Sequence, residues 1–276
     1  MAAMTRWRSD RVWSGLRTAI CVLVAIYMLA PMVVVVVISF SSAAFLHFPP
    51  PGLSLQWYRR LFATPEWTSS LLTSVEIMLP TGLLATGLGT AAAVGLARAR
   101  FPGAALIGAL LMAPMVVPVI IIAAAVYTLF GSWDLNGTLQ GLILAHTLLT
   151  VPYVMANVRG AMETVDRQLE NAALTLGATP WRGFWRITFP LILPGVLSGL
   201  LFAMVVSFDE LIVSLFISTP EVRPVTVQMW SDVRGAVDPT ISAIATVLFA
   251  VSFLLLLADF LFRRHAGTDA SSGLLP

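Results

Sequence analysis

Three acidic side chains interrupt otherwise apolar stretches of this 276-residue sequence, and their chemistry needs an explanation. Glu76 lies in one such stretch, and Asp209 and Glu210 are neighbours in another. A carboxylate inside a membrane span costs about 2.5–3.5 kcal/mol on insertion scales, so it usually lines a pathway or pairs with a polar group. We therefore predict that Glu76, Asp209 and Glu210 contact a solute in a pathway, with a preference for a cationic solute.

Each of these sites also has a structural interpretation. Glu76 could be a carboxylate near the outer surface, solvated or hydrogen-bonded to Ser74. Adjacent helix positions point about 100° apart, so Asp209 and Glu210 cannot face one cavity equally. One of them would then pair nearby, break the helix or bond to a partner subunit. His146 is interpreted as a packing residue rather than a proton relay, because no carboxylate lies near it in sequence.

The sequence contains no arrangement typical of a catalytic or metal centre. It has no visible nucleophile–base pair, no paired histidine ligands and no glycine-rich phosphate loop, and Cys21 is its single cysteine. All 16 basic residues are arginine. Because a phosphate-binding P-loop needs its lysine, we predict that this chain is not an enzyme and that any ATP hydrolysis belongs to another subunit.

The composition predicts an all-α integral membrane protein. Hydrophobic residues make up 58% of the chain and charged residues only 11%, too few to cover the surface of a soluble domain. About 20 helical residues cross a bilayer core of about 30 Å. Six segments are long enough, at about 17–40, 69–97, 103–130, 138–157, 188–218 and 240–262.

The arginines predict the orientation of these spans. With the N-terminus inside, twelve arginines fall on the inner side and four on the outer side. This excess follows the positive-inside rule and places both termini and the 158–187 loop in the cytoplasm. We predict one transmembrane domain over residues 1–264 and a disordered Gly/Ser-rich tail over 265–276.

The polar loop at 163–190 has the pattern of a short docking helix. Leu169, Ala172, Ala173 and Leu176 form one apolar stripe at helical spacing. Asp166 is a suitable N-cap, and Gly177 stands where a left-handed residue would end the helix. Thr179 would cap a second helix, with Pro180 at its first position.

The same loop resembles the cytoplasmic EAA loop of binding-protein-dependent ABC transporter permeases. The matching residues are Ala172, Ala173, Gly177, Ile187 and Pro190, whereas Asn171 stands where the family has Glu, with Glu170 just before it, and Phe189 replaces Leu. The resemblance implies that the loop couples the permease to an ATPase. The expected coupling residues are Glu170, Asn171, Ala172, Ala173, Leu176, Gly177, Ala178, Ile187 and Pro190.

Other stretches resemble the polyamine (spermidine/putrescine) branch, and in particular its second permease subunit. They are WY and LF at 57–62, LGTAAAVGLARARFPG from Leu88, SFDELIVSLFIS from Ser207, and PVTVQMW from Pro224 followed by DPT at 238–240. Related iron, thiamine and opine systems share much of this pattern, so an importer for another solute stays open.

The resemblance implies a type I ABC importer permease with six transmembrane helices in the bacterial inner membrane. One chain would form half of the pathway, beside a second and different permease subunit. The other implied partners are two cytoplasmic ATPases, which hold ATP and Mg, and an extracytoplasmic binding protein; this chain would bind no cofactor and no nucleic acid. The alternatives are a transporter driven by an ion gradient, a membrane enzyme and an assembly scaffold. The first would more naturally show inverted repeats and acid–base networks within one chain.

Overall fold

The structure is a computed structural model that describes residues 2–98, 102–235 and 238–272, and within these ranges it is helical with no named strand. The long helices are α1 (Ala2–Ser39), α3 (Pro65–Arg98), α6 (Leu139–Glu163), α9 (Phe189–Phe208) and α12 (Thr240–Ser272). The shorter ones are α2 (Gln56–Ala63), α4 (Ala104–Met112), α5 (Val119–Gly131), α7 (Arg167–Thr175), α8 (Pro180–Gly183), α10 (Ile212–Ile217) and α11 (Val225–Arg234).

The described residues form two compact units, and the smaller one comprises the chain up to Thr64 together with 232–247. Its span is Gly15–Ser39, and the 18-residue apolar window within this span contains no buried residue. The segment after α1 is held to α2 by the Trp57 indole N–H, which donates to the Ser41 carbonyl oxygen at 2.8 Å. Arg60 in α2 pairs with Asp238 at 3.1 Å.

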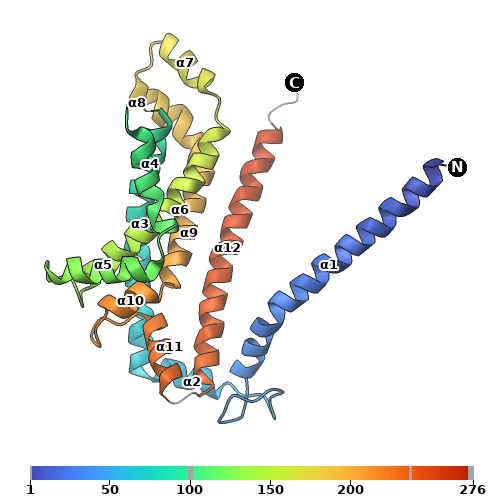
Figure 1. Cartoon of the computed structure of the whole chain (residues 1–276), viewed down its shortest axis with the longest axis vertical. Helices are drawn as coiled ribbons and strands as arrows, with labels where there is room; N and C mark the ends of the chain where they lie inside the picture. Colours follow the sequence, from blue (N-terminus) through green and yellow to red (C-terminus); the bar gives the residue numbers. More distant parts are fainter. Residues whose placement is uncertain (1, 99–101, 236–237, 273–276) are drawn as a thin grey trace. The chain divides into compact units, whose positions relative to one another are not determined.

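The larger unit is built on α3, α6 and α9, which lie side by side (Figure 1). Glycines allow their backbones to approach closely. A Cβ atom at Gly195 of α9 would lie 3.0 Å from the Asn157 carbonyl oxygen of α6. A Cβ at Gly89 of α3 would lie 2.7 Å from the Val154 Cβ, also on α6. Such contacts between small residues are the usual way in which membrane helices associate.

The third predicted span, 103–130, is broken. α4 and the 3-10 turn Ala113–Met115 are followed by α5, and the two parts are bent by 101°. Pro118 is the N-cap of α5 and has no N–H to donate, so the helix cannot run through this point. The described chain therefore has five helices long and apolar enough to span a membrane, or six if the bent pair counts as one span.

The fifth predicted span, 188–218, is not a single helix either. A continuous helical segment, Pro180–Phe208, starts earlier and includes a π-helical turn at Phe184–Thr188. It ends at Phe208, and α10 begins only at Ile212. Glu210 lies in this break, and its carboxylate accepts hydrogen bonds from backbone N–H groups of α10. These bonds cap the start of α10, so α9 and α10 remain separate helices.

The end of the chain also differs from the expectation. A disordered tail is predicted from residue 265, but α12 continues as a helix to Ser272. Once a helix exists, each added residue contributes one more hydrogen bond, so a long apolar helix can extend into a polar sequence.

Replacing Gly89 by alanine should destabilise the bundle. The new methyl group would meet Val154 side-chain carbons at 2.7 and 2.9 Å and the Val151 carbonyl oxygen at 3.0 Å. Overpacking of this kind typically costs about 1–3 kcal/mol. Gly87, on the same helix, has open space where a Cβ would be, so Gly87→Ala is the matched control. Thermal unfolding in detergent should give a lower midpoint for Gly89→Ala alone, and equal midpoints would contradict the close α3–α6 contact.

Candidate functional site

Helix α7 is capped at both ends by residues of its own loop. The Asp166 carboxylate accepts from the Gln168 N–H at 2.9 Å, as expected for an N-cap. At the other end Gly177 has a φ of +88°. The Gly177 N–H donates to the Leu174 carbonyl and the Ala178 N–H to the Ala173 carbonyl, both at 3.0 Å, which is a Schellman ending. The next helix, α8, is capped by the Thr179 hydroxyl, which accepts from the Arg182 N–H at 3.3 Å. These expectations of the local structure are confirmed.

α7 has no buried residue, and its leucines are unusually exposed. Leu169 is 48% exposed, Leu174 45% and Leu176 89%. The described unit offers nothing that covers them. An exposed apolar surface rimmed by polar residues marks an interaction site.

α7 is also tied to the end of α3 by polar side chains. The Arg98 guanidinium forms an ion pair with the Glu170 carboxylate and donates to the Thr188 hydroxyl at 2.9 Å. The Thr188 hydroxyl donates in turn to Glu170. One turn before Glu170, Arg167 donates to the Ala97 carbonyl oxygen at 2.6 Å. We call these contacts the α7 tether; they join the exposed helix to α3 and to the π-helical turn.

The predicted coupling residues therefore separate into two groups. Asn171, Ala172, Ala173 and Ala178 lie on or next to α7, with Asn171 and Ala172 exposed, whereas Ile187 and Pro190 lie in the π-helical turn and the first turn of α9. Glu170 lies on α7 as well, but its carboxylate is bound to Arg98 within the α7 tether. The sequence gives no sign that Arg98 is its partner, since 72 residues separate them.

The predicted pathway acids also differ in their surroundings. The Glu210 carboxylate is 7% exposed and accepts the Val213 N–H at 2.9 Å and the Ser214 N–H at 3.0 Å. Asp209 next to it is exposed and is the C-cap of α9. Glu76 on α3 is exposed as well, while its neighbour Ser74 accepts the Val225 N–H at 2.8 Å. Of the adjacent pair, Asp209 is therefore the exposed residue and Glu210 the one whose carboxylate is buried.

His146 has a carboxylate neighbour that the sequence does not indicate. Its Nε2 lies 3.7 Å from the Glu210 Oε2, although the two residues belong to different spans. Its ring nitrogens also contact two serine hydroxyls, at 3.0 Å each. The buried ring is thus held by a network of side chains.

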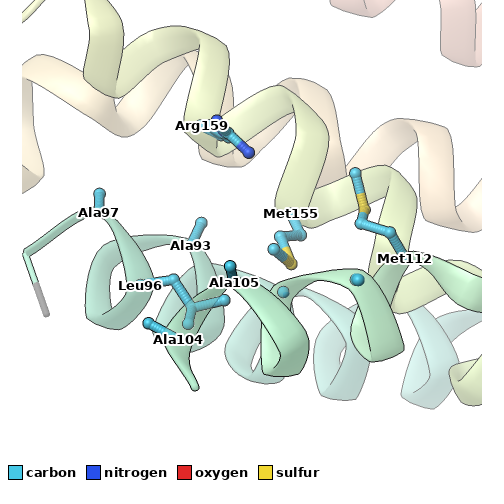
Figure 2. A pocket seen from close by; sticks show the side chains of 10 residues that line it. Ala93, Leu96, Ala97, Ala104, Ala105, Met112, Met155 and Arg159 are labelled. Carbon is cyan, nitrogen blue, oxygen red and sulfur yellow. The ribbon is translucent and has the colours of Figure 1, made fainter. Parts of the chain in front are cut away.

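A cavity of about 580 Å³ lies between α3, α4 and α6. Figure 2 shows Met155 and Arg159 of α6 across from alanines of α3 and α4. Arg159 is the one charged side chain among the described lining residues. Its positive charge would repel a cation, so this cavity is not suited to bind the cationic solute predicted from Glu76, Asp209 and Glu210.

The described chain combines several membrane-length helices, a broken span and a tethered loop helix with an uncovered apolar surface, which fits a subunit of a membrane transport pathway. The chain belongs to the family described as "Binding-protein-dependent transport system inner membrane component", which matches residues 85–266. It is an inner-membrane permease subunit of the ABC importer type, rather than an ion-gradient transporter, and its system depends on a binding protein.

Two relatives are similar over most of their length. The "Putrescine transport system permease protein PotI" of Escherichia coli (strain K12) is 33% identical, with 92% of each chain covered. The "Spermidine/putrescine transport system permease protein PotC" of Haemophilus influenzae is 30% identical, with 90% of this chain and 96% of the relative covered. The fold is similar to that of a bacterial ABC transporter involved in alginate import, with a TM-score of 0.70, 13% identity, and 93% and 97% coverage.

Removing the charge of Glu170 should loosen α7. In Glu170→Gln the amide can still hydrogen-bond, but the ion pair with Arg98 is lost. Hydrogen bonds to charged groups contribute about 1.5–3 kcal/mol, and partial exposure of this pair reduces the effect, so we expect roughly threefold to tenfold faster hydrogen exchange of the α7 amides.

The matched control is Glu163→Gln. Glu163 forms an exposed pair with Arg159 at 3.7 Å, on the helix that precedes the loop. Exposed pairs contribute little, so exchange in α7 should stay unchanged in this variant. Equal exchange rates in the two variants would contradict a tether through Glu170.

Proposed function

We propose that this chain forms half of the translocation pathway of an ATP-driven importer for polyamines such as putrescine and spermidine. Coupling to an ATPase is supported by one observation: α7 has an uncovered apolar surface and is tethered to α3. The solute class is supported by the names of the relatives and by the exposed carboxylates at Asp209 and Glu76. Another solute of the same family of systems is the competing proposal.

In this proposal α7 seats in a groove of a cytoplasmic ATPase. Leu169, Leu174 and Leu176 enter the groove, while Asn171 and Ala172 lie against it. The ATPase subunits bind ATP and Mg, and this chain binds no cofactor. The positive-inside distribution of arginine supports a cytoplasmic position for α7 and for both termini.

ATP acts on the pathway through the tether. Nucleotide must bind one arrangement of the ATPases better than the other, since a ligand shifts an equilibrium only by its differential affinity. A displacement of α7 then pulls on α3 through Glu170 and Arg167, and on α9 through Thr188. A second permease subunit completes the path, and the binding protein delivers the solute from the outer side.

The solute is tested by ATPase activity of the reconstituted complex. We expect stimulation by binding protein together with putrescine or spermidine, and no stimulation by uncharged solutes of similar size. Gly177→Asp should abolish this stimulation, because the added side chain stands at the turn that ends α7. Normal stimulation of the Gly177→Asp complex would contradict coupling through the loop. Stimulation by a different solute alone would overturn the polyamine assignment and leave the coupling intact.

Charging the exposed apolar surface should prevent docking. Leu176 is 89% exposed, so Leu176→Glu leaves the fold of the chain intact but places a carboxylate at the proposed contact. We expect at least about a tenfold weaker association with the ATPase, the size of a typical contribution from one buried interface side chain.

Leu53→Glu is the control for this substitution. Leu53 is 81% exposed and lies in the loop after α1, outside the proposed ATPase contact. Co-purification of ATPase with permease in detergent should fall for Leu176→Glu and stay unchanged for Leu53→Glu. Full recovery of the ATPase with Leu176→Glu would contradict docking through α7.

A further inference from the structure

The interruption between α9 and α10 is held in place by the side chain of Glu210. α9 ends at Phe208 and α10 begins at Ile212, so the intervening residues leave backbone groups without helical partners. The Glu210 carboxylate accepts the N–H groups of Val213 and Ser214. The Glu210 carbonyl oxygen accepts the Thr226 hydroxyl at 2.9 Å. The break is thus a satisfied, specific structure rather than a frayed end.

His146 bridges the two sides of this break. Its Nδ1 lies 3.0 Å from the hydroxyl of Ser207, near the end of α9, and its Nε2 lies 3.0 Å from the hydroxyl of Ser214, in α10. The ring is 1% exposed and the two serines are 4% and 0% exposed. A neutral imidazole has one donor and one acceptor nitrogen, and a hydroxyl can serve either, so both contacts can be satisfied together.

The Glu210 carboxylate lies within the same network. Its Oε2 is 3.7 Å from His146 Nε2 and also accepts the Ser214 N–H. Moving the imidazole would therefore disturb the serine on each side and the group that caps α10. Buried networks that are fully satisfied fix one geometry, because each unpaired group would cost the full desolvation penalty.

Asp209 is exposed, and its side chain takes no part in this network. Its backbone N–H still donates to the Val205 carbonyl oxygen at 3.1 Å, so its position follows the end of α9. Its carboxylate is exposed and has no side-chain partner in the described part of the chain. Asp209 lies directly after the apolar span Pro180–Phe208, where a carboxylate without a partner of its own is uncommon and indicates a function.

We propose that His146 is a positioning residue: by bridging Ser207 and Ser214 around Glu210, it fixes the break at which Asp209 presents its carboxylate to the cationic solute. The identity of the solute rests on the function proposed above. The geometry of the break does not, and the two can be tested separately.

The first readout is the reactivity of position 209, which needs no assumption about the solute. Asp209→Cys is placed in a Cys21→Ser background, since Cys21 is the chain's single cysteine. The reconstituted transporter is labelled with a small cationic methanethiosulfonate reagent. We expect His146→Ala to change the labelling rate at position 209 by at least about threefold, and His146→Gln to restore it in part because its amide can replace a ring nitrogen.

A control cysteine at Leu53, which is 81% exposed and lies outside the proposed ATPase contact, should keep its labelling rate in the presence of His146→Ala. If His146→Ala prevents folding, Ser207→Ala and Ser214→Ala remove one side of the bridge at a time and carry the same test. An unchanged rate at position 209 in the folded variants overturns the proposal.

The second readout is uptake of putrescine. We expect His146→Ala to raise KM about tenfold with a smaller change in kcat, and to cause no further rise in an Asp209→Asn background, because the two residues act as one unit. If the double variant instead raised KM by the product of the two single effects, His146 would act independently of Asp209, and the proposal would be overturned. If the wild-type transporter does not take up putrescine, the proposed solute fails, while the labelling experiment still decides the positioning role.

Discussion

The ion pair between Arg98 and Glu170 is the contact on which the functional interpretation depends. α7 buries no residue, so the hydrophobic effect does not fix its place on the permease. Its position comes from polar contacts on one side, with Glu170 bonded to Arg98 and Thr188, and Arg167 bonded to the Ala97 carbonyl. This arrangement leaves the leucines of α7 available to another protein while the helix stays attached to α3.

The packing behind the tether explains how movement at α7 would reach the pathway. α3 and α9 approach α6 closely at Gly89, Gly195 and Gly199, and closely packed interiors transmit displacement rather than absorb it. α9 then ends at the break that contains Asp209. The network of His146 and Glu210 gives this break a defined geometry. One continuous set of packed helices thus connects the proposed ATPase contact with the proposed solute contact.

The helix caps of the 163–190 loop could be predicted from the sequence, whereas contacts between residues far apart in the chain could not. The N-cap at Asp166 and the left-handed Gly177 depend on neighbouring residues alone, so sequence patterns indicate them. Glu170 and His146 instead have partners 72 and 64 residues away, and no periodicity encodes such a contact. The break after α9 fits the alternative in which one of Asp209 and Glu210 interrupts the helix. The sequence does not show where the helix ends, because the flanking residues are apolar and also fit one long span.

The most direct measurement is the distance between α7 and α3 during nucleotide binding. Spin labels at Thr175→Cys and Ala91→Cys, in a Cys21→Ser background, report this distance by double electron–electron resonance in the assembled transporter. If α7 and α3 move as one body, the mean distance stays the same with and without ATP, and the distribution broadens only when Glu170 is replaced by alanine. A shift of roughly one helical turn, about 5.4 Å, on ATP binding to the wild-type complex would show that α7 moves independently of α3. That result would contradict coupling through the tether.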